Sequence, residues 1–244
     1  MCVIAFDTCF DACSVAIARE LEGARVVTGT CEAMATGQAE RLLPMLGEVL
    51  DEAGLAHRDV TGIAVTTGPG TFTGTRIGVA AARGLALALG VPIVTASTLE
   101  VMALAAAADA NVRRRLDHLG EASELVVAVD ARRGEIYRQR FAARSLSPIS
   151  HPEVIGLADV DASPHDAIIV GSGAAALVAA MSAAMASSGA AGVHEAHLSG
   201  LLPDARFLAL TAHKRQPVAH PAPLYLRAPD AKPQAGASLA RAPA

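Results

Sequence analysis

The sequence has few aromatic and few charged residues. Of its 244 residues only 3% are aromatic and 18% are charged, and there is no Trp. The 24 Asp and Glu residues outnumber the 20 Lys and Arg, so the formal net charge is -4 and a strongly basic nucleic-acid binder is excluded. The hydrophobic fraction of 52% excludes a disordered tail. Because aromatic residues are so few, the core must consist of small and aliphatic side chains in closely packed elements.

Signals for disulfides, a leader, a membrane span and a metal are also missing. No C-x-x-C pair occurs among the four cysteines, so we expect reduced thiols at Cys2, Cys9, Cys13 and Cys31. The N-terminus has no basic region, which argues against a signal peptide and makes the cytoplasm the expected location. The uncharged stretch 167–193 is mostly Ala, Gly and Ser, so we expect no membrane span. His194 and His197 lack the H-E-x-x-H spacing, so we expect no metal site there.

The first 108 residues alternate between short apolar runs and helical patterns. Strands are predicted over residues 2–6, 12–18, 25–31, 62–67 and 91–95. Helices are predicted over residues 42–50, 73–89 and 98–108. Pro44 is expected near the first turn of the first of these helices, or as a kink in it. Three strands followed by alternating helices and strands indicate an α/β architecture.

The second part of the chain repeats this plan weakly, in topology rather than in sequence. Strands are predicted over residues 124–129, 135–141 and 167–170, and helices over 174–186 and 204–214. We therefore expect a first unit of residues 1–108 and a smaller second unit of residues 109–202. Residues 203–229 are expected to form a helix and an extended segment that packs back on the first unit, and residues 230–244 a flexible tail.

A glycine-rich loop between a strand and a helix is the most informative segment, Gly68-Pro-Gly-Thr-Phe-Thr-Gly-Thr-Arg-Ile-Gly78. Free N–H groups in such a loop can bind an anion at the start of the helix. The loop lacks the Gly-Lys-Ser/Thr end of a P-loop and the acidic residue of a dinucleotide fingerprint. Anion binding and a purely structural turn therefore both remain open, and the structural turn is favoured.

Small residues recur every four positions in the following helix, at Gly74, Gly78, Ala82 and Ala86. A stripe with so little side-chain bulk lets another helix approach closely. The neighbouring element is either this protein's own sheet or first helix, or a helix of a partner protein. The spacing alone favours neither interpretation.

Asp7 and Asp130 form a candidate carboxylate pair, because each ends the first apolar strand of its half of the chain. Carboxylates at such strand ends can position the Mg²⁺ of a nucleotide in a cleft between two lobes. Thr8 and the turn 131–134, which contains Arg132, would complete the cleft walls. The alternative is that each Asp closes its own turn, as Asp commonly does.

Four other segments accompany the glycine loop in a fixed order: Phe6-Asp-Thr8, Ala12-Cys-Ser-Val15, Asp130-Ala-Arg-Arg-Gly-Glu-Ile-Tyr137 and Tyr225-Leu-Arg227. With the loop they closely resemble the TsaB (YeaZ) family, from the first strand to about residue 232. The resemblance implies the two-lobed fold of actin, sugar kinases and Hsp70, also called the ASKHA fold. In that fold each lobe is built on an RNase-H-like mixed sheet.

The resemblance also implies a function. TsaB proteins are non-catalytic scaffold subunits that bind the transferase TsaD and, with it, the ATPase TsaE. The complex attaches a threonylcarbamoyl group to the adenosine next to the anticodon in tRNAs that read codons beginning with A. The chain is thus expected not to be an enzyme and to bind no cofactor stably, with ATP and Mg²⁺ at the partner complex and tRNA reached through it. A homodimer is an expected form of the isolated chain.

The resemblance places the partner interface on the first two helices. The expected interface residues are Leu42, Leu43, Leu46, Thr73, Gly74, Arg76, Ile77, Gly78 and Ala82. On this basis Gly78→Leu or Ala82→Leu would leave the isolated chain folded and weaken partner binding. A vestigial nucleotide cleft is expected at Asp7, Thr8, Asp130, Arg132, Gly171 and Gly173. The alternative function is an ATP-dependent kinase or ATPase of the same fold that uses Asp7 and Asp130.

Two positions argue against a catalytic TsaD-like protein. TsaD has two metal-binding His residues four apart, and in this chain the matching positions are Ser97 and Val101, which cannot bind such a metal. The same loss argues against a metallopeptidase. The chain departs from the usual TsaB pattern at Gln38, Thr71 and Thr75, and the polar Thr75 is expected to alter the partner surface.

Overall fold

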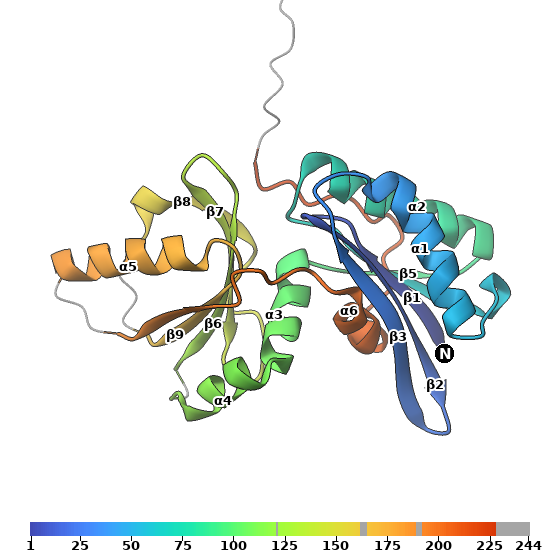
Figure 1. Cartoon of the computed structure of the whole chain (residues 1–244), viewed down its shortest axis with the longest axis horizontal. Helices are drawn as coiled ribbons and strands as arrows, with labels where there is room; N and C mark the ends of the chain where they lie inside the picture. The colour runs from blue at the N-terminus through green and yellow to red at the C-terminus, as the bar shows by residue number, and fades with distance from the viewer. Residues whose placement is uncertain (121, 162–164, 189–191, 228–244) are drawn as a thin grey trace, which may run out of the picture.

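The computed structural model describes residues 1–120, 122–161, 165–188 and 192–227. Two mixed β-sheets lie side by side with helices around them, which confirms the predicted α/β class (Figure 1). The first sheet and its helices comprise β1 (Cys2–Asp7), β2 (Ala12–Leu21), β3 (Ala24–Ala33), α1 (Gln38–Glu52), η1 (His57–Asp59), β4 (Gly62–Thr66), α2 (Phe72–Leu89), β5 (Ile93–Ala96) and α3 (Thr98–Ala108). The remaining elements are α4 (Ala110–His118), β6 (Glu124–Asp130), β7 (Glu135–Ala142), β8 (Glu153–Gly156), η2 (Leu157–Asp159), β9 (Ala167–Val170), α5 (Ala174–Ser188), β10 (His194–His197), α6 (Ala205–Thr211) and η3 (Ala212–Lys214).

The two sheets have the same strand order and direction. The first runs β3-β2-β1-β4-β5, and the second runs β8-β7-β6-β9-β10. In each sheet the first three strands in sequence pair antiparallel, and the last two join as parallel strands. This is the RNase-H-like arrangement, so the predicted repeat of topology is confirmed and the fold has two lobes.

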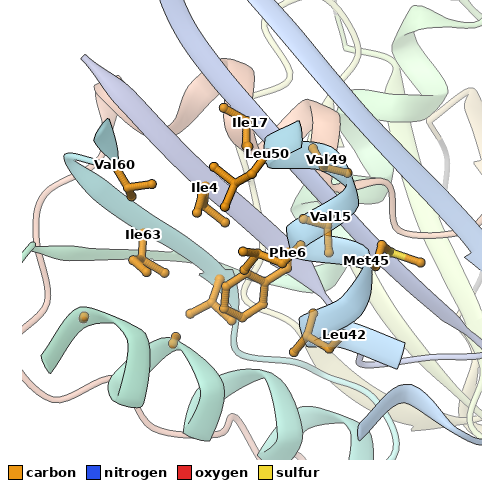
Figure 2. Close-up of a cluster of buried hydrophobic side chains, with 14 of the residues drawn as sticks. Ile4, Phe6, Val15, Ile17, Leu42, Met45, Val49, Leu50, Val60 and Ile63 are labelled. Carbon is orange, nitrogen blue, oxygen red and sulfur yellow. The ribbon is translucent and has the colours of Figure 1, made fainter. Parts of the chain in front are cut away.

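Strand β1 shows how the first lobe forms, because its alternate residues face opposite sides of the sheet. On one side Ile4 and Phe6 pack against the apolar face of α1 (Figure 2). That face recurs at helical spacing, at Leu42, Met45, Leu46, Val49 and Leu50. On the other side Val3 and Ala5 pack against α6. Both faces of the strand are therefore buried, as its continuous apolar run predicts.

Helix α1 starts earlier than its apolar pattern indicated. It begins at Gln38, so Pro44 lies inside the helix rather than at its first turn. Gly37, in the left-handed region with a φ of 95°, precedes the helix, and Arg41 N–H donates to the Gly37 carbonyl at 3.0 Å. The polar first turn carries no apolar periodicity, which is why the pattern missed it.

Helix α3 lies between the two sheets (Figure 1). Leu99, Met102 and Ala106 pack into the core of the second lobe, whereas Val101 packs into the α6 side of the first sheet. The helix is apolar around most of its circumference because it is buried on both sides. It therefore joins the two lobes and does not belong to the first sheet alone.

Besides the short 3-10 helices η1 and η2, three elements were not predicted: α4, β8 and β10. In α4 three consecutive Arg residues mask a short apolar stripe, Val112 and Leu116, and the Asp109 side chain caps the helix by accepting from Asn111 and Val112 N–H. Strands β8 and β10 have four residues each and little apolar alternation. In the part of the chain that the structure describes, no helix has both the length and the apolar content to cross a membrane.

The segment after η3 runs back over the first lobe and reaches the second. Val218 N–H donates to the Ile93 carbonyl and Leu224 N–H to the Thr67 carbonyl, each at 2.7 Å. Arg227 then bonds to the Ala131 carbonyl at 3.2 Å and pairs with Glu135. This segment therefore ties the lobes together. The expected tail at 230–244 lies outside the described residues.

Candidate functional site: the inter-lobe cleft and the α1–α2 face

A cleft of about 710 Å³ lies between the lobes. The β1–β2 turn contributes Phe10 and Asp11, and the glycine loop contributes its stretch from Pro69 to Phe72. The second lobe contributes Asp130 and the start of the β6–β7 turn. The returning C-terminal segment, 224–227, closes the remaining side. The cleft lies between the β1–β2 turn of the first lobe and the equivalent β6–β7 turn of the second lobe, so both halves of the chain supply polar groups to it.

Asp7 is fully buried and does not line this cleft. Its Oδ1 accepts from Cys9 N–H at 2.9 Å, and its Oδ2 accepts from the Thr66 hydroxyl and, at 3.5 Å, from the Thr98 hydroxyl. No cation forms an ion pair with it among the described residues. Burial raises the pKa of the Asp7 carboxyl from its ordinary 3.8 to about 6, although these hydrogen bonds oppose the change. The expectation that Asp7 faces a cleft is wrong.

Asp130 is exposed and lines the cleft. Its Oδ1 accepts from Arg132 N–H at 2.7 Å. Asp7 makes the equivalent bond, because it also accepts from the N–H two residues later, that of Cys9. Both residues therefore close their own turns, in agreement with the alternative interpretation. The structure brings only one of the two expected carboxylates to the cleft.

The other residues expected in the cleft divide in the same way. Arg132 lines the cleft beside Asp130. Thr8 is buried and its hydroxyl donates to the Gly74 carbonyl at 2.7 Å. Gly171 and Gly173 are buried packing positions, where an added Cβ would lie 2.5 Å from the Ala128 carbonyl oxygen or 3.1 Å from the Ile136 side chain. The expectation that Thr8, Gly171 and Gly173 form cleft walls is therefore wrong.

Sequence reasoning missed the aromatic lining of the cleft and the acidic Asp11. The aromatic rings are arranged in two pairs, one with a centroid separation of 6.1 Å and the other with 5.5 Å. The first pair is Phe10 with Tyr137, and the second is Phe72 with Tyr225. Three of these rings, those of Phe72, Tyr137 and Tyr225, lie in the segments that resemble the family. That resemblance was the only signal in the sequence for this lining.

The glycine loop packs closely against the end of β1. Two of its N–H groups are used within the chain: Thr71 N–H donates to the Cys9 carbonyl at 2.6 Å, and Gly74 N–H donates to the Thr71 hydroxyl at 3.1 Å. Gly70 has no room for a side chain, since a Cβ would lie 2.3 Å from the Cys9 carbonyl oxygen. The loop therefore seats α2 against the end of β1, and the N–H groups of Thr71 and Gly74 are not free for an anion.

The small-residue stripe of α2 faces the protein's own core. A Cβ on Gly74 would lie 2.0 Å from the Thr8 carbonyl oxygen, and one on Gly78 would lie 2.8 Å from the Thr8 hydroxyl. Ala82 and Ala86 are buried in the core cluster with α1. The expectation that Gly74, Gly78 and Ala82 contact a partner is wrong, because β1 and the core already occupy that space. Gly78→Leu and Ala82→Leu would accordingly disturb the fold.

Burial also divides the interface residues expected on α1. Leu42 and Leu46 are 1% exposed and belong to the same core, so they are not a partner surface. Leu43 is 56% exposed. Thr73 and Arg76 of α2 are exposed, and Ile77 is half-buried. Helical spacing adds two exposed small residues to these four, Ala80 and Gly84.

We call these six residues the α1–α2 face: Leu43, Thr73, Arg76, Ile77, Ala80 and Gly84. Figure 1 shows α1 and α2 together on the side of the first sheet that points away from the second lobe. An added Cβ on Gly84 would meet nothing within 4 Å, so the backbone of α2 is open to solvent there. A second protein can therefore approach this side of α2 closely.

The positions that depart from the family pattern have structural roles. Gln38 is buried and its Nε2 donates to the Met34 carbonyl at 3.1 Å. Thr71 caps α2. Thr75 is 1% exposed and its hydroxyl donates to the Thr71 carbonyl at 2.9 Å. The expectation that Thr75 alters the partner surface is wrong, because its side chain points into the protein.

Ser97 and Val101 also have structural roles. The Ser97 hydroxyl caps α3 by accepting from Glu100 N–H at 2.9 Å, and it donates to Gln139 Oε1 at 2.8 Å. Val101 is fully buried between α3 and the first sheet. Within the described ranges no group of three or more His, Cys, Asp and Glu side chains is arranged to hold a metal ion.

The two RNase-H-like lobes, with a cleft between them, place this chain in the class of two-lobed α/β proteins. Comparison with known proteins narrows the class. A family model described as TsaD, tRNA N6-adenosine threonylcarbamoyltransferase, matches residues 32–232. The structure of YeaZ from Pseudomonas aeruginosa is 30% identical, with 92% of this chain and 99% of that chain covered and a TM-score of 0.71. The chain belongs to the TsaB (YeaZ) family.

Two sequence relatives extend the comparison, and the first of them carries the TsaB name. The tRNA threonylcarbamoyladenosine biosynthesis protein TsaB of Escherichia coli is 35% identical over 137 residues, which are 56% of this chain and 53% of that protein. The match thus spans about half the length of that relative. A Mycobacterium tuberculosis protein described as uncharacterized is 32% identical over 239 residues, covering 96% of this chain and 95% of that protein.

Proposed function

We propose that this chain is a non-catalytic subunit in the biosynthesis of threonylcarbamoyladenosine in tRNA. It binds a TsaD-type transferase and, through that transferase, TsaE, for modification of the adenosine next to the anticodon in tRNAs that read codons beginning with A. The observation that carries the non-catalytic role is the buried Val101 beside the capping residue Ser97. These positions support packing and cannot hold the metal of a TsaD-like site. ATP, Mg²⁺ and tRNA are accordingly assigned to the complex.

The α1–α2 face is the proposed surface for the transferase. It combines an exposed Leu43, the small residues Ala80 and Gly84, and the cation of Arg76. Small side chains let a partner helix approach closely, and the apolar residues gain from burial. The same exposed residues are open to a second copy of this chain. A homodimer of the isolated chain that competes with the transferase is therefore part of the proposal.

Ala80→Leu is expected to weaken transferase binding at least tenfold, because the added bulk holds the partner helix away from α2. The affinity is measured by calorimetry, and light scattering reports the size of the complex. The matched control is Ala179→Leu, an exposed alanine on α5 of the second lobe, which should leave affinity unchanged. If both variants bind like the unmodified chain, the partner surface lies elsewhere.

The alternative is a kinase or ATPase that uses the inter-lobe cleft. Asp11 and Asp130 line this cleft and favour some cation affinity, but the buried Asp7 cannot complete the expected pair. We expect Asp130→Asn to change the rate of tRNA modification in a reconstituted reaction by less than twofold. A loss of a hundredfold, with the complex still assembled, would instead support a nucleotide-dependent activity of this chain.

A further inference from the structure

Arg76 on the α1–α2 face is held rigidly by two exposed aromatic rings. Its guanidinium carbon lies 3.3 Å from the ring centroid of Phe72 and 5.4 Å from that of Tyr225. The two rings stack with centroids 5.5 Å apart and an interplanar angle of 29°. Arg76 Nε also donates to the Tyr225 hydroxyl at 2.6 Å. The orientation of the cation is therefore fixed before anything binds.

The outer edge of this guanidinium is unused. Only Nε has a hydrogen bond, and no carboxylate lies within 4 Å of Arg76 among the residues that the structure describes. By contrast Arg41 and Arg140 are paired with the carboxylates of Glu32 and Glu124. The two terminal nitrogens form a planar fork that matches the two oxygens of a carboxylate.

The surroundings of Arg76 fit the centre of a binding site. Phe72 is 47% exposed and Tyr225 is 45% exposed, so both rings still have surface to bury. Arg and Tyr are among the residues that contribute most binding energy at protein interfaces. Because the rings already order the Arg76 side chain, binding does not have to supply that ordering.

We propose that Arg76 binds a carboxylate side chain of the transferase through both terminal nitrogens. This rests on the proposed function, since it assigns a contact within the α1–α2 face. A single carboxylate is favoured over an RNA phosphate chain, because the negative charge near the site repels a chain of phosphates more strongly than it repels one carboxylate. Asp11 and Asp130 line the cleft that Phe72 and Tyr225 also line, and the chain has a net charge of -4, which repels a polyanion.

Tyr225 acts as a positioning residue in this account. It reaches Arg76 from the C-terminal segment, which the 2.7 Å bond from Leu224 N–H to the Thr67 carbonyl fixes beside the glycine loop. Tyr225→Phe keeps the ring and removes the hydroxyl that accepts from Nε. A small loss of affinity is therefore expected from this variant, and a large one from any change of the guanidinium.

Calorimetric titration of the transferase tests the proposal. We expect Arg76→Gln and Arg76→Lys to lower affinity at least tenfold, Lys because it lacks the fork, and Tyr225→Phe to lower it two- to fivefold. Arg76→Gln should also weaken the salt dependence of binding. Arg144→Gln, an exposed arginine of the second lobe, is the matched control and should bind normally. Because Arg76 is exposed, the variants should lose only the small stability of an exposed cation–π contact, and thermal unfolding should show that they remain folded.

Three results would overturn the inference. If Arg76→Gln binds within twofold of the unmodified chain while Ala80→Leu does not bind, the face is right and the carboxylate contact is wrong. If neither change affects binding, the proposed surface itself fails. If Arg76→Gln leaves protein affinity intact and lowers retention of tRNA by the complex in filter binding, the fork binds phosphate instead.

Discussion

Gly74→Ala is expected to lower the free energy of unfolding of the isolated chain by about 3 kcal/mol. The added Cβ would lie 2.0 Å from the Thr8 carbonyl oxygen and 2.7 Å from the Thr71 hydroxyl. The first of these is a backbone atom at the end of β1, so it cannot move away without disturbing the sheet. The shift would also break the hydrogen bond from the Thr8 hydroxyl to the Gly74 carbonyl. Urea unfolding followed by circular dichroism measures the effect.

Gly84→Ala in the same helix is the control for this experiment. An added Cβ there meets nothing within 4 Å, and the position is exposed. Alanine is the better helix former, so this variant should be more stable by about 0.5–1 kcal/mol. Similar effects of the two substitutions would mean that Gly74 does not pack against β1, and the small-residue stripe would again be available to a partner.

Asp7→Asn is expected to raise the free energy of unfolding at pH 8 by up to about 3 kcal/mol. The pKa of the Asp7 carboxyl rises from 3.8 to about 6 because the group is buried. A raised pKa means that the folded chain holds this proton more tightly than the unfolded chain. The contribution of Asp7 to stability is therefore full below about pH 4 and is lost as the pH rises to about 6. Asparagine does not ionise, so it avoids this loss.

The measurement is the difference in stability between the two proteins at several pH values, which removes the effect of all other titrating groups. The gain from Asp7→Asn should be small at pH 4 and reach its maximum above pH 6. Asp130→Asn is the matched control, since Asp130 makes the equivalent turn bond but is exposed, and it should show little change at either pH. A pH-independent difference for Asp7→Asn would show that the carboxyl is not buried in the folded state.

The order of elements could be predicted from the sequence, whereas the environment of single residues could not. Apolar runs and helical spacing are local, so they located β1, α2 and α3 within a few residues. The same spacing identified the stripe from Gly74 to Ala86 but not the direction it faces. That direction depends on how closely Thr8 approaches α2, which is a contact between distant parts of the chain.

The candidate site was predicted only in part for the same reason. The repeat placed Asp7 and Asp130 at equivalent strand ends, and both make equivalent turns. Only Asp7 is covered by α3, whose Thr98 hydroxyl donates to the Asp7 carboxyl. This burial comes from the way in which α3 joins the two lobes, which neither repeat shows by itself. The aromatic lining of the cleft likewise comes from segments that are far apart in sequence, such as those of Phe10 and Tyr225.

Reconstituted tRNA modification tests the central claim, that this chain is a required subunit without transferase activity of its own. The assay contains the TsaD-type transferase, TsaE, threonylcarbamoyl-adenylate, ATP with Mg²⁺, and tRNA, and the modified nucleoside is quantified. We expect no product from this chain without the transferase, and a strong increase in product when it is added to the other components. Ala80→Leu should lose that increase and Ala179→Leu should keep it. Product formed by this chain alone, or a rate that does not depend on it, would contradict the account.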